Sequence, residues 1–564
     1  MKRAKTSPKF IFVVGGVMSG VGKGITSSSV GKILQARGFA VTAVKIDPYV
    51  NVDAGTMNPT EHGEVFVLND GTECDQDMGN YERFLNRDLD KGNYMTTGSI
   101  YLSVIEKERN LGYKGKFVSV VPYIPLAVIE KIERAVKKDK ADIVIIEIGG
   151  TVGEYENTLF LEAIRMQKAK RPDDVLLMLV SYLPAQGGGG ELKTKPTQHA
   201  VRDLHAVGLQ PDIIIARAHV PLDKKRKEKI AFHCSMKERE VISAPDVETI
   251  YDVPINFEKD KITEVLFDKL NLRSKKTDLQ EWRTMARIAK AGKKMVKIGI
   301  VGKYFGTGDF TLTDAYISVI EAIKHATYAE KHRPIIEWLD SEDYDTRHKD
   351  YKTRQKELAA YDGIIVPGGF GMRGVEGKIQ TVRYCREHKI PYLGLCYGMQ
   401  MAVIEFARHM VHLKEANTVE TEPKTKHPVI DIMPDQKALM EKNNYGGTMR
   451  LGAYPAALKN GTIAREAYGT ARISERHRHR YEVNPKYIDR LTKKGILFSG
   501  TSPDKTLMEI MELPREIHPF FVATQFHPEF TSRPLKPHPL FLAFIEAAIG
   551  KRERGGKAKK KIGV

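Results

Sequence analysis

Cysteine is scarce in this sequence. Its 564 residues include only Cys74, Cys234, Cys385 and Cys396, and no two of these have the spacing of a disulfide pair or of a metal-binding motif. A disulfide-stabilised extracellular fold and a cysteine-ligated metal cluster are therefore disfavoured. We expect a cytoplasmic protein whose thiols stay reduced.

Long apolar runs are also missing, since no stretch reaches the roughly 18 residues that a membrane span needs. The basic and then apolar start, MKRAKTSPKFIFVVGG, resembles a signal peptide. Its apolar run at 10–14 is short, however, and leads directly into glycines without a small-residue cleavage site. A first β-strand is the better interpretation. No internal repeat is visible.

Charge of one sign dominates. The formal net charge of +18 comes from 89 Lys and Arg against 71 Asp and Glu. Residues 551–564, KRERGGKAKKKIGV, hold seven bases and one acid and predict a disordered, solvated tail. The remaining excess suits anionic substrates. A nucleic-acid-binding protein is the alternative, although no such motif is present; salt-dependent binding that survives tail removal would support it.

The length of the chain predicts two or more domains. Short, continuously apolar runs alternate with helix-length segments; they occur at residues 10–14, 41–46, 143–148, 175–180, 213–215, 296–304, 363–366 and 392–395. This alternation predicts an α/β fold with parallel sheets covered by helices on both faces. We place two doubly wound domains at 1–273 and 296–550, joined by a basic linker at 274–295 that carries one apolar helical stretch.

A glycine-rich stretch, GGVMSGVGKGI at 15–25, follows the first strand and precedes a helical pattern. Small residues let backbone N–H groups face a phosphate, and Lys23 can reach a phosphate oxygen at the helix N-terminus. The stretch departs from the standard loop G-x-x-x-x-G-K-[ST], because Val17 stands in place of the first glycine and Gly24 in place of the hydroxyl residue. A plain strand–helix turn is the alternative.

Acidic residues near this stretch offer the oxygen ligands that Mg²⁺ prefers. Glu147 ends an apolar strand, and TECDQDMG at 72–79 offers Asp75 or Asp77. An acid that caps a turn and a solvated acidic loop are the alternatives.

The segment KTKPTQH at 193–199 follows a run of four glycines. Its proline and the glycines predict a loop. Lysines at i and i+2 suit a triphosphate, and a generic basic surface loop is the alternative.

Three motifs of the second half carry more specific chemistry. PYLGLCYGMQ at 391–400 predicts a nucleophile elbow that exposes Cys396, where a helix N-terminus favours the thiolate. VPGGFG at 366–371 offers backbone donors for an oxyanion hole. QFHPEF at 525–530 carries His527 and Glu529, which on a strand would share one face as base and orienting carboxylate. Taken singly, the cysteine and the histidine have structural explanations; the three motifs together are specific.

These motifs resemble a class I glutamine amidotransferase domain over about residues 296–550. The resemblance implies that Cys396 attacks the side-chain amide of glutamine, that ammonia leaves, and that water hydrolyses the thioester with His527 as base. It further implies that Gly369 and the Tyr397 N–H hold the oxyanion. The residues implied to hold glutamine are Gln400, Glu420 and Arg480.

The first half resembles the CTP synthase family. The resemblance is carried by the segments KIDPYVNVDAGTMNP, EHGEVFVLNDGTECDQDMGNYERF, EIGGTVGE and KTKPTQH, and RHRHRYEVN in the second half belongs to the same pattern. The resemblance covers about residues 10–547. That family carries a variant phosphate loop, SG-x-GKG, related to that of dethiobiotin synthetases, and residues 19–25 fit it.

The resemblance implies a C–N ligase with glutamine as amido-nitrogen donor. ATP would phosphorylate the 4-oxygen of UTP, internally passed ammonia would attack C4, and CTP, ADP and phosphate would leave, with Mg²⁺ bridging the phosphates. The implied ATP-binding residues are Gly20, Val21, Gly22, Lys23, Gly24, Ile25, Lys45 and Asp77. The implied Mg²⁺ ligands are Asp77 and Glu147. The implied UTP or CTP contacts are Ser19, Glu154, Tyr155, Glu156, Lys193, Thr194, Lys195, Pro196, Thr197, Gln198 and Lys229.

The resemblance also implies a homotetramer, with the UTP site between subunits, CTP as feedback inhibitor and GTP as activator near Phe370 and Arg373. His62 would lie where the ammonia passage meets the synthetase site. This chain has TVGEYEN where many members have TVGDIES. Because that segment would contact the cytosine of the inhibitor, the resemblance implies CTP sensitivity less strongly than it implies catalysis.

Two further alternatives stay open. The first is an amidotransferase that acts on another acceptor, against which the segments KTKPTQH and GTECDQDMG argue. The second is an inactive assembly protein, against which Lys23 and the set of Cys396, His527 and Glu529 argue.

Overall fold

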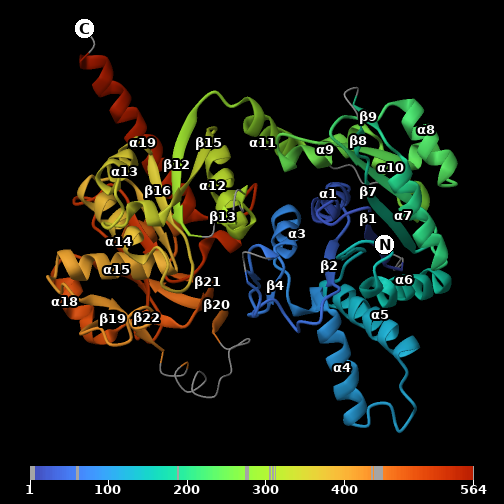
Figure 1. The fold of residues 1–564 in the computed structure, drawn as a ribbon, viewed down its shortest axis with the longest axis horizontal. Helices are drawn as coiled ribbons and strands as arrows, with labels where there is room; N and C mark the ends of the chain where they lie inside the picture. The colour runs from blue at the N-terminus through green and yellow to red at the C-terminus, as the bar shows by residue number, and fades with distance from the viewer. Residues whose placement is uncertain are drawn as a thin grey trace, which may run out of the picture. The chain divides into compact units, whose positions relative to one another are not determined.

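The computed structural model describes residues 7–58, 62–186, 190–273, 278–303, 306–307, 310–311, 313–433, 436 and 449–562, without the side chains at 306–314 and 555–562. Figure 1 shows its ribbon. Within these ranges no helix is both long enough and apolar enough to cross a bilayer.

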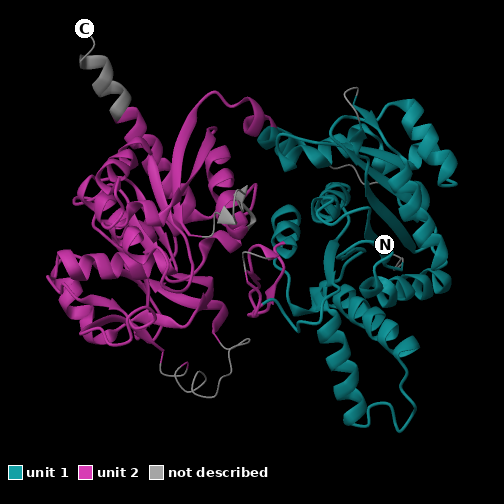
Figure 2. Cartoon of the chain, viewed as in Figure 1, with its two compact units in different colours: residues 1–54, 77–286 teal, residues 55–76, 287–564 magenta. Residues whose placement is uncertain are grey.

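The chain forms two compact units (Figure 2). Unit 1 comprises Met1–Ala54 and Asp77–Ala286, and unit 2 comprises Gly55–Gln76 and Arg287–Val564. The sequence predicted two uninterrupted domains, whereas the structure groups residues 55–76 with the second half of the chain. Most of the predicted linker is helical: α11 (Gln280–Ala291) is held on unit 1 because its Trp282 packs against Phe84 and Tyr251.

Unit 1 is built on a seven-stranded sheet in which every neighbouring pair is parallel. The order is β11 (Val241–Pro245), β10 (Ile213–Ala218), β7 (Val175–Tyr182), β1 (Lys9–Gly16), β6 (Ile143–Ile148), β2 (Val41–Asp47) and β5 (Tyr94–Thr96). The five strands predicted for this half are confirmed. The two edge strands were missed because they are short and lack a long apolar run.

Helices connect these strands, as parallel pairing requires. They are α1 (Lys23–Ala36), α3 (Asp77–Leu85), α4 (Thr97–Arg109), α5 (Val120–Asp139), α6 (Thr158–Lys170), α7 (Lys195–Ala206) and α8 (Lys224–His233). Two further helices, α9 (Val253–Lys259) and α10 (Ile262–Leu270), follow the last strand. The apolar side chains of the strands form the core with the inner faces of α5, α6 and α7. The predicted α/β class is therefore confirmed.

Unit 2 contains a nine-stranded sheet. Its order is β15 (Arg333–Asp340), β12 (Met295–Gly302), β16 (Gly363–Val366), β17 (Tyr392–Leu395), β25 (Phe521–Thr524), β24 (Met508–Glu512), β23 (Leu497–Thr501), β20 (Arg450–Leu458) and β21 (Arg472–His479). The first five strands are parallel and the rest pair antiparallel. Of the parallel strands, β12, β16 and β17 were predicted, and β15 and β25 were missed. The antiparallel half was not predicted, because its strands carry charged residues and lack the continuous apolar runs used to find strands.

The main helices of unit 2 are α12 (Ile317–Ala329), α13 (Tyr351–Glu357), α14 (Val375–Glu387), α15 (Tyr397–His409), α17 (Ile463–Tyr468), α18 (Ile488–Lys493) and α19 (Pro539–Ile562). A separate small sheet is formed by β18 (Ala416–Thr418), β19 (His427–Ile432) and β22 (Tyr481–Val483). The two apolar clusters of this unit include residues of α12, α14, α15 and α19.

The predicted disordered tail begins inside α19. The Lys551 ammonium donates to the carbonyl of Ala359 at 3.1 Å, and Arg552 pairs with Asp362 at 3.0 Å. The backbone stays helical to Ile562. The start of the tail is therefore anchored on unit 2, which corrects the expectation of disorder from residue 551.

The segment 55–76 is held in unit 2 by two arginines of β21. Arg478 donates to the Glu73 carboxylate at 2.8 Å, and Arg476 donates to the Val67 carbonyl at 3.1 Å and to the Asn69 side chain at 2.6 Å. The segment contains the hairpin β3 (Phe66–Val67) and β4 (Glu73–Cys74). β21 contains the first residues of the motif RHRHRYEVN, and its Arg478 also contacts Cys396 through its carbonyl, so these contacts bring the segment to the cysteine-bearing site.

Candidate active site

Cys396 lies between the end of β17 and the start of α15, with φ of 49° and ψ of −96°. A non-glycine residue at positive φ is strained, and such strain is typical of a nucleophile elbow. Both flanking glycines are required: a Cβ at Gly398 would lie 2.2 Å from the Val366 carbonyl, and one at Gly394 would lie 2.7 Å from the Tyr392 hydroxyl. The predicted elbow is therefore present in the structure.

His527 and Glu529 form a close pair, with 2.7 Å between Nδ1 and Oε1. Burial by itself lowers the pKa of His527, but the charges of Glu529 and Cys396 outweigh it and raise that pKa to about 10. The sequence suggested that both residues lie on a strand, but the structure shows that they do not. β25 ends at Thr524, and the 3-10 turn Pro528–Thr531 folds the carboxylate back onto the ring.

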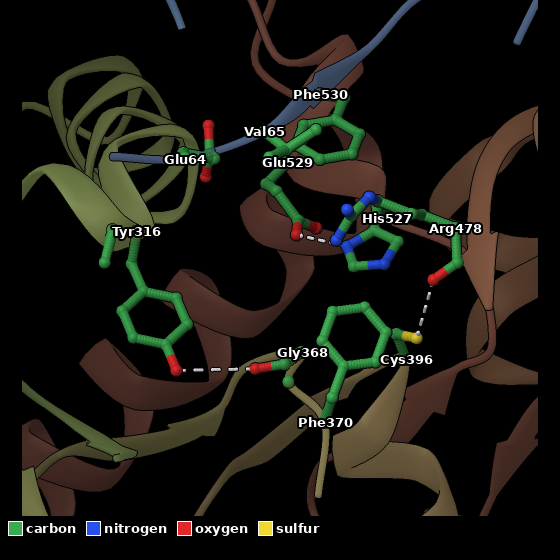
Figure 3. Close-up of a pocket in the computed structure, with 12 residues that line it drawn as sticks. Glu64, Val65, Tyr316, Gly368, Phe370, Cys396, Arg478, His527, Glu529 and Phe530 are labelled. Carbon is green, nitrogen blue, oxygen red and sulfur yellow. Dashed lines mark hydrogen bonds and ion pairs between the residues drawn. The ribbon is translucent and has the colours of Figure 1, made fainter. Parts of the chain in front are cut away.

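A cavity of about 60 Å³ joins these side chains (Figure 3). Its lining residues are Glu64, Val65, Ala315, Tyr316, Gly368, Gly369, Phe370, Cys396, Arg478, His527, Glu529 and Phe530. A Cβ at Gly368 would lie 2.8 Å from the His527 ring, so this position also requires glycine. Glu64 and Val65 were not predicted here, and the structure places them at the cavity. His62, predicted where the ammonia passage meets the synthetase site, is exposed, and its role stays a prediction.

A second cavity of about 210 Å³ opens on the other side of Cys396. It is lined by Gly369, Phe370, Cys396, Tyr397, Gln400, Glu420, His479, Arg480 and Tyr481. All five residues implied to hold the oxyanion and the glutamine thus meet at one cavity beside the nucleophile. Burial raises the pKa of the Glu420 carboxyl.

The loop after β16 is fixed through Gly371, whose φ is +73°. Its N–H donates to Glu420 at 2.7 Å, and its carbonyl accepts from Lys303 at 3.1 Å and from the Tyr397 hydroxyl at 3.0 Å. These contacts hold Gly369 beside Cys396, where an oxyanion donor is needed.

In unit 1 the glycine-rich loop leads from β1 into α1, with positive φ at Val17, Gly20 and Gly22. The buried Lys23 ammonium donates to the Gly150 carbonyl at 2.6 Å. Gly24 faces Asp77 so closely that a Cβ would lie 2.1 Å from the carboxylate oxygen. The departure from Ser or Thr at this position therefore has a steric reason.

Lys45 lies between three carboxylates. Its ammonium pairs with Asp77, with Glu147 at 3.0 Å and with Asp47 at 3.6 Å. Burial alone lowers the pKa of Lys45, but these acids raise it well above its usual value. Of the two open candidates in the acidic run, the structure brings Asp77 to Glu147.

Asp77 and Glu147 supply oxygen donors of the type that Mg²⁺ prefers. Among the residues that the structure describes, no group of three or more His, Cys, Asp or Glu side chains could hold a metal ion. Two carboxylates would leave a cation to take its further ligands from a phosphate group, as is usual for Mg²⁺.

The segment 193–199 is not the loop that the sequence predicted. α7 begins at Lys195 with Pro196 in its first turn, where proline is well tolerated because the missing N–H has no helical partner. Thr197 accepts a hydrogen bond from Ser181 at 2.9 Å and is buried, so it serves the packing of the helix. Lys193 pairs with Glu191 at 2.7 Å.

The remaining predicted nucleotide contacts lie on the surface of unit 1. Glu154 accepts from the Thr151 backbone at 2.9 Å, and Tyr155 is 94% exposed. Ser19, Glu156 and Lys229 are exposed as well.

The chain matches two family models, "CTP synthase N-terminus" over residues 9–272 and "Glutamine amidotransferase class-I" over residues 311–547. A CTP synthase of Caldanaerobacter subterraneus is 50% identical over 96% of this chain and 98% of the relative. A CTP synthase of Methanococcus maripaludis is 50% identical over 96% of this chain and its own full length. The solved glutaminase domain of Trypanosoma brucei CTPS with bound acivicin is 37% identical, covers 45% of this chain and 94% of that domain, and has a TM-score of 0.41.

Proposed function

The chain belongs to the CTP synthase family of glutamine-dependent C–N ligases, and from this premise we propose that it aminates UTP with ammonia released at Cys396. The observation that carries the proposal is the meeting of Cys396, His527, Glu529 and the predicted glutamine-binding residues at two adjoining cavities.

The first half-reaction is glutamine hydrolysis. The Cys396 thiolate attacks the side-chain amide carbon, and the N–H groups near Gly369 and Tyr397 hold the oxyanion. His527 donates its proton to the departing nitrogen, so that ammonia leaves and a thioester remains. The neutral imidazole then takes a proton from water, whose oxygen attacks the thioester and releases glutamate. Glu529 keeps the ring oriented throughout.

Recognition of glutamine falls to the larger cavity. Glu420 carries the negative charge that suits the amino group, and Arg480 carries the positive charge that suits the carboxylate. Gln400, whose amide donates to the Tyr481 carbonyl at 3.2 Å, borders the space for the side chain.

The second half-reaction belongs to unit 1. Lys23 and Lys45 contact the ATP phosphates, together with N–H groups of the loop 20–25. Mg²⁺, held by Asp77 and Glu147, would offset the negative charge of the phosphates. The γ-phosphoryl group passes to the 4-oxygen of UTP, ammonia forms a bond to C4, and phosphate leaves as CTP forms. UTP is contacted by Ser19, by residues 193–198 and by Lys229.

The family context extends the proposal to regulation and assembly. Ammonia passes internally to the synthetase site, and GTP activates glutamine hydrolysis near Phe370 and Arg373. CTP inhibits by sharing the phosphate site of UTP, while residues 154–156 contact its cytosine. The working form is a homotetramer. Each of these statements is a proposal for this chain.

The decisive experiment compares wild type with Cys396→Ala in CTP formation from UTP, ATP and Mg²⁺. We expect wild type to use glutamine or ammonium, and the variant to use ammonium alone. If wild type makes no CTP from either nitrogen source, the UTP assignment is wrong. If Cys396→Ala still uses glutamine, the assignment of the nucleophile is wrong.

A further inference from the structure

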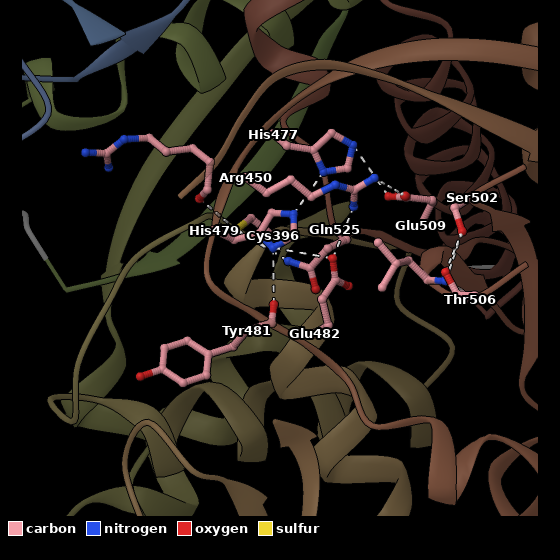
Figure 4. A network of polar contacts seen from close by, with 12 residues as sticks. Cys396, Arg450, His477, His479, Tyr481, Glu482, Ser502, Thr506, Glu509 and Gln525 are labelled. Carbon is pink, nitrogen blue, oxygen red and sulfur yellow. Dashed lines mark hydrogen bonds and ion pairs between the residues drawn. The ribbon is translucent and has the colours of Figure 1, made fainter. Parts of the chain in front are cut away.

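Two polar groups besides His527 contact the Cys396 sulfur. The Arg478 carbonyl lies 3.8 Å from Sγ (Figure 3), and the Gln525 side-chain nitrogen lies 3.7 Å from it (Figure 4). They favour opposite protonation states: a carbonyl oxygen accepts a hydrogen bond from S–H, whereas an amide N–H donates a hydrogen bond to a thiolate. The structure therefore pairs each form of the sulfur with its own partner.

The sheet fixes the position of Gln525. β17 and β25 are parallel, with Leu395 opposite Thr524, and the Cys396 N–H donates to the Thr524 carbonyl at 2.7 Å. The residue after Thr524 therefore lies beside the residue after Leu395. The Gln525 backbone N–H is in turn anchored on the Glu509 carbonyl of β24 at 2.9 Å.

The Gln525 side chain is completely buried. Its amide oxygen has no hydrogen-bond partner in the part of the chain that the structure describes. A buried amide with an unsatisfied oxygen is costly, by about 1–3 kcal/mol. Packing alone would be served better by an apolar side chain, so the amide nitrogen at Sγ calls for a functional explanation.

A buried ion cluster supports the strand behind Gln525 (Figure 4). Arg450 bridges the carboxylates of Glu482 at 3.1 Å and Glu509 at 2.7 Å. His477 and His479 hydrogen-bond to each other at 2.9 Å, and burial lowers the pKa of both well below the usual value. The cluster thus places its permanent positive charge on Arg450 and fixes Glu509, whose backbone holds Gln525.

We propose that Gln525 is a further catalytic residue of glutamine hydrolysis, because its amide donates a hydrogen bond to the Cys396 thiolate. The inference rests on the proposed role of Cys396 as nucleophile. The bond raises the thiolate fraction before attack, and it stabilises the sulfur again when the thiolate departs from the tetrahedral adduct of thioester hydrolysis. His527 moves the protons in both steps, and Gln525 transfers none.

Other charged or titratable groups also border the sulfur, and the test leaves them in place. The groups that line the two cavities at the sulfur are Glu64, Tyr316, Tyr397, Glu420, Arg478, His479, Arg480, Tyr481, His527 and Glu529.

The test compares the full-length wild type with Gln525→Leu and Gln525→Glu. Iodoacetamide alkylation of Cys396, followed by peptide mass spectrometry, is measured across the pH range in which the rate rises. A hydrogen bond to a charged group is worth about tenfold in the thiolate equilibrium. For Gln525→Leu we therefore expect the midpoint of the alkylation profile about one pH unit higher. Gln525→Glu places a carboxylate beside the sulfur and should move it further in the same direction.

Steady-state kinetics give the second readout. We expect kcat for glutamine hydrolysis to fall about tenfold in Gln525→Leu with KM nearly unchanged, because the amide contacts the sulfur rather than the glutamine. Gln380→Leu, a buried glutamine on α14 that bonds Glu376 at 2.8 Å, is the matched control and should leave both readouts as in wild type. A thermal unfolding scan checks that unit 2, which carries both positions, is folded in each variant.

An alkylation profile of Gln525→Leu that coincides with that of wild type would overturn the inference. If the leucine variant does not fold, an unchanged profile of the nearly isosteric Gln525→Glu would overturn it instead. Failure of the proposed function looks different. In that case wild type would not hydrolyse glutamine at all, while the alkylation profiles would still report the contact.

Discussion

At the scale of single residues, short distances decide which side chains are allowed. Gly24 occupies a position where standard phosphate loops have Ser or Thr, and the sequence gives no reason for the difference. The structure does, because the Asp77 carboxylate fills the space that a Cβ would need. Asp77 also pairs with Lys45, so it cannot move away without breaking a buried ion pair.

Gly24→Ser, which restores the standard motif, should therefore abolish the synthetase reaction and spare the glutaminase. We expect ammonium-dependent CTP formation to fall at least about hundredfold, since the displacement of Asp77 and Lys45 disturbs positioning groups. Gly550→Ala, where a Cβ would meet no atom within 4 Å, is the control. Activity of Gly24→Ser equal to that of wild type would contradict the steric reading.

His527 gives a pH prediction at the same scale. Its pKa is raised to about 10, so the imidazolium that protonates the departing amide nitrogen persists through neutral pH and is lost only as pH rises through that value. Removing the Glu529 charge with Glu529→Gln takes away the largest raising influence, and the pKa must fall.

The alkaline limb of kcat/KM for glutamine should accordingly move to lower pH in Glu529→Gln, and kcat should drop about hundredfold or more through loss of general acid–base catalysis. A pH–rate profile of both proteins decides this. An alkaline limb at the same pH in both would show that Glu529 does not set the pKa of His527.

At the scale of elements, the segment 55–76 shows how a strand organises a distant part of the sequence. Arg476 on β21 is fully buried, bonds Val67 and Asn69, and lies over the Phe66 ring at 5.4 Å. Arg478 on the same strand both holds this segment through Glu73 and lines the cavity at Cys396, whereas His479 lines the second cavity.

Arg476→Ala should loosen the segment without unfolding the unit. Loss of these bonds leaves buried polar groups unsatisfied, at a cost of about 2–4 kcal/mol in local stability. Limited proteolysis should then cut within 55–76 faster by a factor of about a hundred. Arg472→Ala, exposed on the same strand, is the matched control. Equal protection of the segment in Arg476→Ala and wild type would contradict this role.

At the scale of the whole molecule, each unit has its own sheet and its own core. The two tryptophans of the chain fall one in each unit. Trp282 fixes α11 on unit 1 and is 2% exposed, and Trp338 packs on the core of unit 2.

Trp282→Ala should lower the thermal transition of unit 1 and leave that of unit 2 nearly unchanged, because removal of a buried tryptophan costs about 3–5 kcal/mol. Thermal inactivation of ammonium-dependent synthesis and of glutaminase, followed in parallel, separates the two. Trp338→Ala should show the reverse order. A single transition that shifts equally for both activities would show that the units unfold together.

The sequence by itself determined the strands with continuous apolar runs, the α/β class and the elbow at Cys396, because these depend on local periodicity and on neighbours within a few residues. It could not predict the charged antiparallel strands, the helix that begins at Lys195, or the turn that brings Glu529 onto His527. For each of these three segments, the residue types favoured a local structure that differs from the one observed.

Only the tertiary structure decided which distant residues meet. It placed residues 55–76 on β21, Asp77 against Gly24, and Gln525 at the Cys396 sulfur. Such contacts are set by strand order and by packing between residues that are far apart in the sequence. The spacing of residues in a single sequence does not indicate which of them will meet. The chemistry of the site was therefore readable from its motifs, and its steric and electrostatic support was not.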